Sequence, residues 1–383
     1  MSGDRVFLVT GATGVVGGAI VERLLAEPRT SVHLLLRAAS ETVLEQRLQS
    51  VLDFRSDRLD RERLIDRVFA VRGDVSLPRL GMTTKAYIAL SSRVTNVVHA
   101  AGNVKLNLTI DEARRAAVGA ADEVLRFASA CSQVRSFPKV EYISTVGVAG
   151  RRPGLIAEGP IDDAFGYHNN YEQAKAEAET LMRRSMEEGA SITFHRPSMV
   201  VGDSQDGRVS SFQVFYHLVR FIAGSRTHGL LPRFDRVALD LVPADYVAAV
   251  IEASSRRSDS VGQTFHLCSG PRGAILLAEL GDIVRKFLEE RGERVFTPHY
   301  IPRPLMRAII ELARCASVGR TRRALGTLPH FLDYLEEEQL FANDRTAEFF
   351  GAAGIEVPPI KAFLGPVLDY WLRHSRHGRP SNG

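Results

Sequence analysis

A short apolar run followed by evenly spaced glycines is the feature that most constrains the fold of this chain. Residues 6–10 form a β-branched and aliphatic run that is predicted to be a buried strand. Gly11, Gly14 and Gly17 follow at three-residue spacing, and residues 15–25 then show helical periodicity. A strand, a glycine turn and a helix in this order aim backbone N–H groups and the positive end of a helix at one point. Such a turn suits a pyrophosphate.

Each glycine is expected to have its own role in this turn. Gly11 makes the tight bend, Gly14 lets the backbone approach the phosphates, and Gly17 allows the helix to lie against the strand. A glycine-rich turn that binds no ligand is the alternative. The cofactor-binding residues expected from this segment are Thr10, Gly11, Thr13, Gly14, Val15, Val16 and Gly17.

Strands and helices alternate along the first two thirds of the sequence. Further apolar runs that are typical of strands lie at 31–37, 67–75, 95–102, 139–145 and 191–198. This alternation predicts an α/β fold with a Rossmann-type, doubly wound parallel sheet, whose ligand crevice lies at the carboxyl ends of the strands. The residues expected at those ends include Thr10, Arg37, Asp74, Ala100 and Thr145.

A tyrosine, a lysine and a threonine form the second informative group. Tyr171 and Lys175 lie one helical turn apart in NNYEQAKAEAE, and Thr145 ends the run KVEYIST. An acid, a cation and a hydroxyl are the groups needed to move a hydride onto or off a carbonyl carbon. A surface i, i+4 pair and a plain strand end are the alternatives for these residues. The phosphate-binding turn in the same chain favours the catalytic interpretation.

The end of the second strand bears on the choice of cofactor. An acidic residue there usually holds the ribose diol of NAD, whereas an arginine suits the 2′-phosphate of NADP. Arg37 occupies this place, and no acidic residue follows it before Glu41. The sequence therefore favours NADPH. Arg47 is either a second phosphate contact or a solvated helix residue.

Composition excludes several other classes of site. The three cysteines form no C-x-x-C pair, and His99, His168 and His195 lack the spacing of metal ligands. We therefore expect no metal, and we interpret these histidines as hydrogen-bonded structural residues, with a minor acid/base role left open for His168. The 383 residues, 45% of them hydrophobic, are enough for a large core.

Charge and hydropathy indicate the surroundings of the protein. The net charge of +4 comes from scattered arginines without a basic block, so we expect no nucleic-acid partner. A basic rim could attract coenzyme A or an acidic carrier protein, although a solvated surface explains it equally well. The start MSGDRVFLVT leaves no room for a signal peptide, and no apolar run approaches the length of a membrane span. We expect a cytoplasmic protein without an integral membrane segment.

Together these motifs resemble the extended short-chain dehydrogenase/reductase superfamily. The resemblance rests on TGxxGxxG, the YIST strand end, the Y-x-x-x-K helix and HRPSMVVGD. Segments such as LLLRAAS, VVHAAGNV and LVPADYV are similar to fatty acyl-CoA reductases and to the thioester-reductase domains that end carboxylic acid reductases and some peptide and polyketide synthases. The match covers about residues 5–270 and is weaker over the helical tail.

The resemblance implies a role for each residue of the site. Tyr171 would donate a proton to the carbonyl oxygen, Lys175 would bind the nicotinamide ribose and lower the pKa of the tyrosine, and Thr145 would hydrogen-bond the same oxygen. Asp74 and Val75 would flank the adenine, although Asp74 could also be a plain turn residue. Further cofactor contacts are implied for Ala100, Ala101, Gly102, Pro197, Ser198 and Val200.

The expected function is therefore NADPH-dependent reduction of an acyl thioester, carried by coenzyme A or a carrier protein. Reduction would give an aldehyde, and a second hydride transfer would give the alcohol. The sequence carries no adenylation module before the first strand, so the acyl group is expected to arrive already as a thioester. A sugar-nucleotide epimerase/dehydratase, a hydroxysteroid-type dehydrogenase and a non-catalytic NADP-sensing protein are the alternatives.

The resemblance and the element pattern divide the chain into two parts. We expect an NADP-binding Rossmann domain at 1–200, with returning segments at about 238–270. A smaller, mainly helical substrate-binding lid is expected at 201–237 and 271–376, before a disordered tail at 377–383. The aromatic residues Phe212, Phe215, Tyr216 and Phe221 either pack in the core or line a tunnel for an acyl chain.

One position departs from the superfamily pattern. Extended members often carry an asparagine in a run like N-V-x-G-T, where it supports a proton relay. This chain has AAVGAAD, with Ala117 at that place. Either a water molecule replaces the asparagine amide in the relay, or reduction of the substrate requires less proton transfer.

Overall fold

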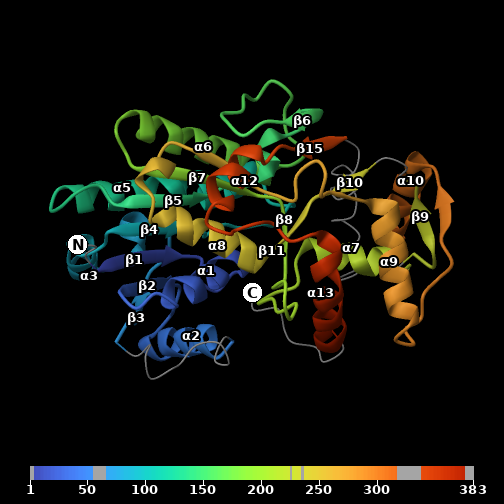
Figure 1. Cartoon of the computed structure of the whole chain (residues 1–383), viewed down its shortest axis with the longest axis horizontal. Coiled ribbons are helices and arrows are strands. Elements are labelled where there is room, and N and C mark those ends of the chain that lie inside the picture. Colours follow the sequence, from blue (N-terminus) through green and yellow to red (C-terminus); the bar gives the residue numbers. More distant parts are fainter. Residues whose placement is uncertain (1–3, 55–65, 225–226, 234–236, 317–337, 376–383) are drawn as a thin grey trace.

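A parallel sheet forms the centre of the molecule. The computed structural model describes residues 4–54, 66–224, 227–233, 237–316 and 338–375. Within them, seven parallel strands follow the order β3-β2-β1-β4-β5-β7-β12 (Figure 1). The strands are β1 (Arg5–Thr10), β2 (Thr30–Leu36), β3 (Val68–Arg72), β4 (Asn96–His99), β5 (Lys139–Ile143), β7 (Ile192–Pro197) and β12 (Thr264–Leu267). The order reverses between β1 and β4, which confirms the predicted doubly wound sheet and its switch point.

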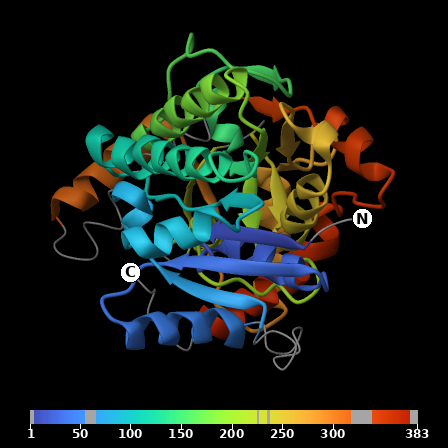
Figure 2. The ribbon, with the colours of Figure 1, turned by 90° about the vertical axis from the view of Figure 1, so that its left-hand side faces the viewer.

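Helices cover both faces of this sheet, as the side view in Figure 2 shows. The core on one face is built with α1 (Val15–Leu25), α2 (Glu41–Asp53) and α8 (Ala244–Ser255). The core on the other face is built with α3 (Thr84–Ser91), α5 (Ala120–Ser132) and α6 (Asn170–Glu187). Apart from the edge strand β3, the strands are almost entirely buried, which explains their continuous apolar sequences.

The helical segment from residue 110 to residue 132 is not uniform. It consists of α4 (Ile110–Arg114), a wider π-type turn η2 (Arg115–Gly119) and α5. Thr109 and Glu112 form a capping box at its start. A π-type turn inserts one extra residue and is frequent at functional sites. Hydrophobic periodicity cannot reveal such an insertion, because the apolar face continues beyond it.

The C-terminal part lies beyond the carboxyl ends of the central strands, on the right of Figure 1. Its helices are α7 (Val214–Ile222), α9 (Leu277–Glu289), α10 (Arg303–Ala316) and α13 (Ile360–Ser375). It also contains short strand pairs, so it is less purely helical than the sequence suggests. These pairs are β8 (Met199–Val201) with β11 (Leu241–Pro243), β9 (Leu230–Pro232) with β14 (His299–Ile301), and β10 (Ala238–Leu239) with β13 (Ile275–Leu276).

Part of the C-terminal region returns to the central sheet. β15 (Gln339–Phe341) pairs with β6 (Gly154–Ile156), and α12 (Asp344–Gly351) packs near β12 (Figure 1). Three short helical turns are η1 (Pro78–Gly81), η3 (Val146–Ala149) and η4 (Ser258–Ser260). The tail predicted at 377–383 lies outside the described residues.

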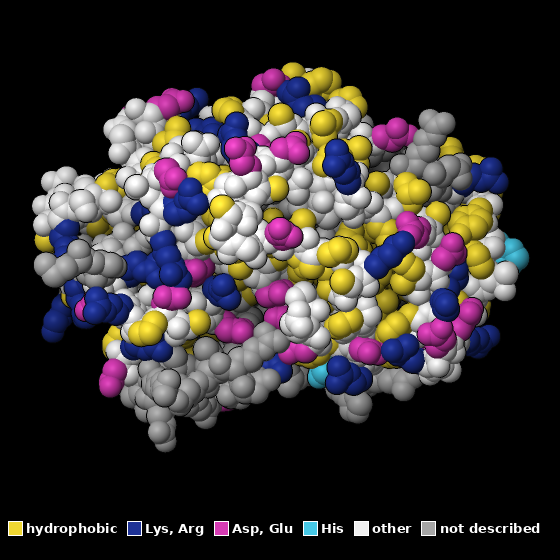
Figure 3. Space-filling model, in the orientation of Figure 1, with side chains coloured by type: hydrophobic (Ala, Val, Ile, Leu, Met, Phe, Trp, Pro, Cys, Tyr) yellow, Lys and Arg dark blue, Asp and Glu magenta, His cyan; other side chains and the backbone are white. Residues whose placement is uncertain are grey.

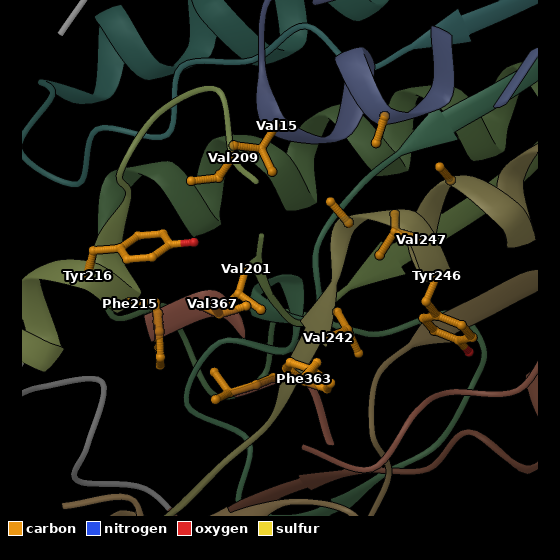
Figure 4. Close-up of a cluster of buried hydrophobic side chains, with 14 of the residues drawn as sticks. Val15, Val201, Val209, Phe215, Tyr216, Val242, Tyr246, Val247, Phe363 and Val367 are labelled. Carbon is orange, nitrogen blue, oxygen red and sulfur yellow. The ribbon is translucent and has the colours of Figure 1, made fainter. Parts of the chain in front are cut away.

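One apolar core joins the two parts of the chain. Figure 4 shows Val15 of α1, Val201 of β8 and Phe363 of α13 around the same interior, with Phe215 of α7 beside them. This shared core fixes α7 and α13 against the Rossmann part. On the face shown in Figure 3, basic and acidic side chains are interspersed. Over the described ranges, no helix has the length and apolar character needed to cross a membrane.

Candidate active site

The glycine turn has the geometry of a phosphate cradle. Gly11 has φ +77°, and a Cβ there would lie 2.6 Å from backbone atoms of Ala100 and Ala101. A Cβ on Gly17 would lie 2.2 Å from the carbonyl oxygen of Gly11. Gly14 caps α1 without a side-chain hydrogen bond, and the first turn of α1 contains no acidic residue. The backbone N–H groups and positive end of the helix therefore suit an anion such as a pyrophosphate.

A buried polar pair holds the ends of β1 and β4 together. Thr10 Oγ1 lies 2.9 Å from His99 Nδ1 and accepts a hydrogen bond of 3.2 Å from the N–H of Ala101. Burial, followed by the nearby charge of Lys175, lowers the pKa of His99 to about 3. The imidazole is therefore neutral at physiological pH. This contact places residues 100–102 beside the glycine turn.

Three arginines lie on the elements where a 2′-phosphate is expected. Arg37 follows β2 directly and is exposed, and none of the described residues forms an ion pair with it. Arg47 is half-buried on α2. Arg72, at the end of β3, donates a hydrogen bond of 3.0 Å to the carbonyl oxygen of Ala39. Sequence reasoning missed Arg72, because its proximity to the loop after β2 comes from the pairing of β2 with β3.

Two of the expected cofactor residues have partners within the protein. The Asp74 carboxylate accepts hydrogen bonds from the N–H and hydroxyl of Ser76, at 2.9 and 2.7 Å, which favours its turn interpretation. Ser198 donates a hydrogen bond of 2.6 Å to Asp240. Asp240 also accepts the N–H of Ser269 at 2.8 Å, so it ties together the segments after β7 and β12. Burial raises the pKa of Asp240.

The other expected cofactor residues lie near the glycine turn and the carboxyl ends of the strands. Thr13 precedes the cap of α1, and Val15 and Val16 form its first turn. Val75 follows β3 and is half-buried. Pro197 ends β7, and Val200 lies on β8. All of them lie at or just after the carboxyl ends of the strands or at the start of α1, so the topology gathers them around the same crevice.

The three expected catalytic side chains meet at the carboxyl end of β5. Tyr171 is the second residue of α6, and its phenol lies close enough to the Thr145 side chain for this threonine to lower the phenol pKa. Thr145 Oγ1 accepts the N–H of Gly147 at 3.1 Å, which caps η3. Lys175 Nζ donates a hydrogen bond of 2.7 Å to the carbonyl oxygen of Ile143 and is 6% exposed. A surface i, i+4 pair is therefore the wrong description of Tyr171 and Lys175.

Burial dominates the electrostatics of this triple. Burial, with a smaller contribution from the charge of Glu172, raises the pKa of Tyr171 to about 12, while the Thr145 hydrogen bond opposes this. Burial lowers the pKa of Lys175 to about 8, against the opposite effect of Glu179. The expectation that Lys175 lowers the pKa of Tyr171 is therefore corrected. Burial dominates the shift of the Tyr171 pKa, and the Lys175 amine donates its hydrogen bond to the carbonyl of Ile143.

A small hollow lies between Tyr171, Lys175 and η2. Its volume is about 10 Å³, enough for about one water molecule. Ala113, Ala116 and Ala117 line the side formed by α4 and η2. The position where superfamily members often carry an asparagine therefore borders the catalytic side chains, but it presents a methyl group.

A larger apolar pocket lies in the C-terminal part. Its volume is about 290 Å³, and it is lined by Leu218, Phe221, Ile222, Leu231, Pro232, Arg233, Leu277, Ala278, Gly281, Arg285 and Tyr300. Tyr216 lies on the opposite side of α7, where its hydroxyl oxygen accepts the N–H of Gly202 at 3.1 Å. Phe215 and Tyr216 are buried in the core, whereas Phe221 borders the pocket. Core packing is therefore confirmed for Phe215 and Tyr216. Phe221 is buried in the same core as well as bordering the pocket, and its use in an acyl tunnel stays a prediction.

Two of the three candidate histidines, His168 and His195, are hydrogen-bonded to carboxylates. His195 Nε2 lies 2.6 Å from Glu141, and His168 Nδ1 lies 2.9 Å from Glu172. In the part of the chain that the structure describes, no three His, Cys, Asp or Glu residues are grouped so that they could hold a metal ion.

Comparison with known proteins identifies a family and several relatives. Residues 9–251 match the model of an NAD-binding family described as male sterility protein. The chain is 29% identical over 273 residues to the non-canonical nonribosomal peptide synthetase FrzA of Cladobotryum sp, covering 69% of this chain and 26% of that protein. It is 25% identical over 376 residues to a linear gramicidin synthase polypeptide of Brevibacillus parabrevis, covering 96% of this chain and 7% of that protein. The chain thus spans about a quarter or less of these relatives.

Solved structures agree with the family. The terminal R domain from the myxalamid PKS-NRPS pathway superposes with a TM-score of 0.82 at 26% identity, covering 98% of this chain and 92% of that one. The reductase domain of a nonribosomal peptide synthetase from Mycobacterium tuberculosis shares the fold, with a TM-score of 0.73 at 22% identity over 97% of this chain and 91% of that one. The chain therefore belongs to the NAD-binding family described as male sterility protein and is a thioester-reductase-type member of the extended short-chain dehydrogenase/reductases.

Proposed function

We propose that the protein reduces an acyl thioester to an aldehyde with NADPH, using Tyr171, Lys175 and Thr145. The observation that carries this proposal is the meeting of these three side chains at the carboxyl end of β5, on the sheet edge that also bears the glycine turn. The phenol is protonated at neutral pH, which is the state that a proton donor needs. A cytoplasmic location remains part of the proposal.

The residues for the cofactor follow from the same geometry. The N–H groups at the start of α1 would hold the pyrophosphate, and Arg37, with Arg47 or Arg72 nearby, would neutralise the 2′-phosphate. Lys175 would bind the nicotinamide ribose. Bound NADPH supplies a hydride. The glycine turn fits it because a Cβ on Gly11 or Gly17 would clash with neighbouring backbone atoms and disrupt the turn.

The chemistry requires one hydride and one proton for each thioester. The hydride adds to the thioester carbon, and the electron pair of the C=O bond moves onto oxygen. Thr145 and Tyr171 would stabilise this oxyanion, and the Tyr171 proton would complete a hemithioacetal. When the C–S bond breaks, the oxygen returns its proton and the thiolate takes one up. The products are an aldehyde and a free thiol, and a second hydride transfer would give the alcohol.

The carrier of the acyl group is proposed from the relatives. FrzA is named as a peptide synthetase and the Brevibacillus relative as a gramicidin synthase, and one structure of the same fold is described as a thiolation-reductase di-domain at 18% identity. A thioester on a carrier protein is therefore the first substrate to test, with acyl-CoA as the second. The apolar pocket beside α7 is a candidate for the distal part of a long acyl chain.

The test is a substrate panel with product identification. Acyl-carrier and acyl-CoA thioesters of several lengths are mixed with protein and NADPH, and NADPH oxidation, free thiol and aldehyde are measured together. The proposal predicts that the free thiol equals the sum of aldehyde and any alcohol formed, with one NADPH consumed for each aldehyde and two for each alcohol. Turnover of a nucleotide sugar or a hydroxysteroid without thioester turnover would support those alternatives. NADPH binding without turnover of any substrate would indicate a sensing protein.

A further inference from the structure

Two buried side chains that are hydrogen-bonded to each other lie immediately beside the candidate proton donor. Glu172 and His168 have side chains that are 1% and 2% exposed, and Glu172 Oε2 lies 2.9 Å from His168 Nδ1. The same oxygen accepts the backbone N–H of His168 at 2.9 Å. A carboxylate at such depth is costly unless hydrogen bonds compensate it, so its retention here requires an explanation.

The pair fixes the start of α6 from two directions. Asn169 caps the helix and accepts the backbone N–H of Glu172 at 3.0 Å. In return, Glu172 reaches back over the first turn to His168, which precedes the cap. This is a variant of the reciprocal capping box, in which two N–H groups are satisfied across one turn. Tyr171 lies inside this closed turn, so its backbone position depends on both contacts.

The charge of Glu172 also acts on the phenol. It adds to the effect of burial in raising the pKa of Tyr171. The other titratable groups around the phenol are Lys175 on α6, His99 at the end of β4 and Tyr142 on β5. His99 has a pKa near 3 and Tyr142 has a pKa well above its ordinary value, so both are neutral at physiological pH. Among these groups, Glu172 contributes a negative charge and Lys175 a positive charge, and the charge of Glu172 raises the pKa of the phenol.

We propose that Glu172, held by His168, is a positioning residue for Tyr171: its carboxylate closes the first turn of α6 and so fixes the backbone from which the phenol projects. This inference rests on the proposed role of Tyr171 as proton donor. Simple helix capping is the competing explanation. It predicts a loss of stability that is independent of Tyr171 chemistry.

A double-mutant cycle separates the two explanations. Glu172→Gln removes the charge and weakens the contact to His168, and it should lower kcat by about tenfold or more, because small displacements of a catalytic group are costly. The dissociation constant of NADPH should change by less than about twofold. In a Tyr171→Phe background, the same substitution should have little further effect on the residual rate, because the group that it positions is gone. Glu177→Gln, on the same helix in an exposed pair with Arg114, is the matched control and should leave kcat unchanged.

The outcomes of this cycle distinguish a positioning role of Glu172 from simple helix capping. Equal losses from Glu172→Gln in both backgrounds, or no loss in either, would overturn the positioning role. If Tyr171→Phe alone keeps full activity, the proposed function itself fails, and the cycle shows this separately. Circular dichroism and melting temperature report whether each variant folds. Should Glu172→Gln fail to fold, His168→Ala in the same cycle removes the partner while leaving the carboxylate, and the same dependence on Tyr171 is required.

Discussion

Replacing Lys175 by methionine should make the protein more stable and inactive at the same time. Lys175 is 6% exposed, and burial lowers the pKa of its amine from 10.5 to about 8. This fall means that folding with a protonated Lys175 costs about 3 kcal/mol at neutral pH. Methionine has a similar shape and no charge, so Lys175→Met removes that cost.

The net gain is smaller than this cost. The amine donates a hydrogen bond of 2.7 Å to Ile143 and lies 4.8 Å from the centre of the Tyr142 ring, and both contacts are lost. A hydrogen bond of this kind contributes about 1 kcal/mol. We therefore expect Lys175→Met to raise the free energy of unfolding by about 1–2 kcal/mol at pH 7, with loss of reductase activity.

The dependence on pH makes this prediction specific. Between pH 8 and 10.5 the unfolded chain holds a proton on this amine that the folded protein has released, so the parent gains stability as the pH rises through this window. Methionine has no such dependence. The advantage of the variant should therefore shrink by about 2 kcal/mol between pH 7 and about pH 9.5.

Urea unfolding of both proteins at several pH values measures this difference. Lys286→Met is the control, because this lysine is on the exposed surface of α9 with a distant partner, Glu290, at 3.9 Å. The control should show no comparable pH-dependent change. A variant that is less stable than the parent at pH 7, or a stability difference that does not vary with pH, would refute the reasoning.

Three further predictions concern the cofactor, the relay and the acyl pocket. Arg37→Ala should weaken NADPH binding by about 1.5–3 kcal/mol and NADH binding much less, and equal effects in fluorescence titrations would remove Arg37 from the 2′-phosphate site. Ala117→Asn should keep substantial activity because an amide can replace a relay water, whereas Ala117→Leu should lose it, and similar kcat values for the two would argue against a relay through the hollow. Gly281→Leu, whose Cβ would meet only the guanidinium end of Arg285 at 3.1 Å, should lower kcat/KM for long acyl chains more than for short ones. A uniform decrease would indicate that the pocket does not hold the acyl chain.

Local patterns were sufficient to predict the part of the fold that holds the cofactor. The strand, the glycine turn and helix α1 are adjacent in sequence, and the spacing of Tyr171 and Lys175 is a property of one helix. Alternating strands and helices allow few topologies, which is why a doubly wound parallel sheet followed from the pattern. The resemblance to thioester reductases rested on these same segments.

The remaining features depend on contacts that no local pattern encodes. Arg72 reaches from the end of β3 to the loop after the neighbouring strand β2. Asp240 accepts hydrogen bonds from Ser198, which follows β7, and from Ser269, which follows β12. The pKa of Tyr171 was mispredicted because its sign depends on burial, and burial is set by packing. Glu172 was visible beside Tyr171 in the sequence. Only the fold of the preceding loop reveals its contact with His168.

The transfer of deuterium from labelled NADPH to the product tests the central claim most directly. The parent protein is incubated with an acyl-carrier thioester and NADPH that carries deuterium at the transferred position, and the product is analysed by mass spectrometry. The account predicts an aldehyde with one deuterium on its carbonyl carbon, or an alcohol with two. Tyr171→Phe should bind NADPH but form about 10²-fold less of this product. Release of thiol with an unlabelled carboxylic acid, or unchanged labelling by Tyr171→Phe, would contradict it.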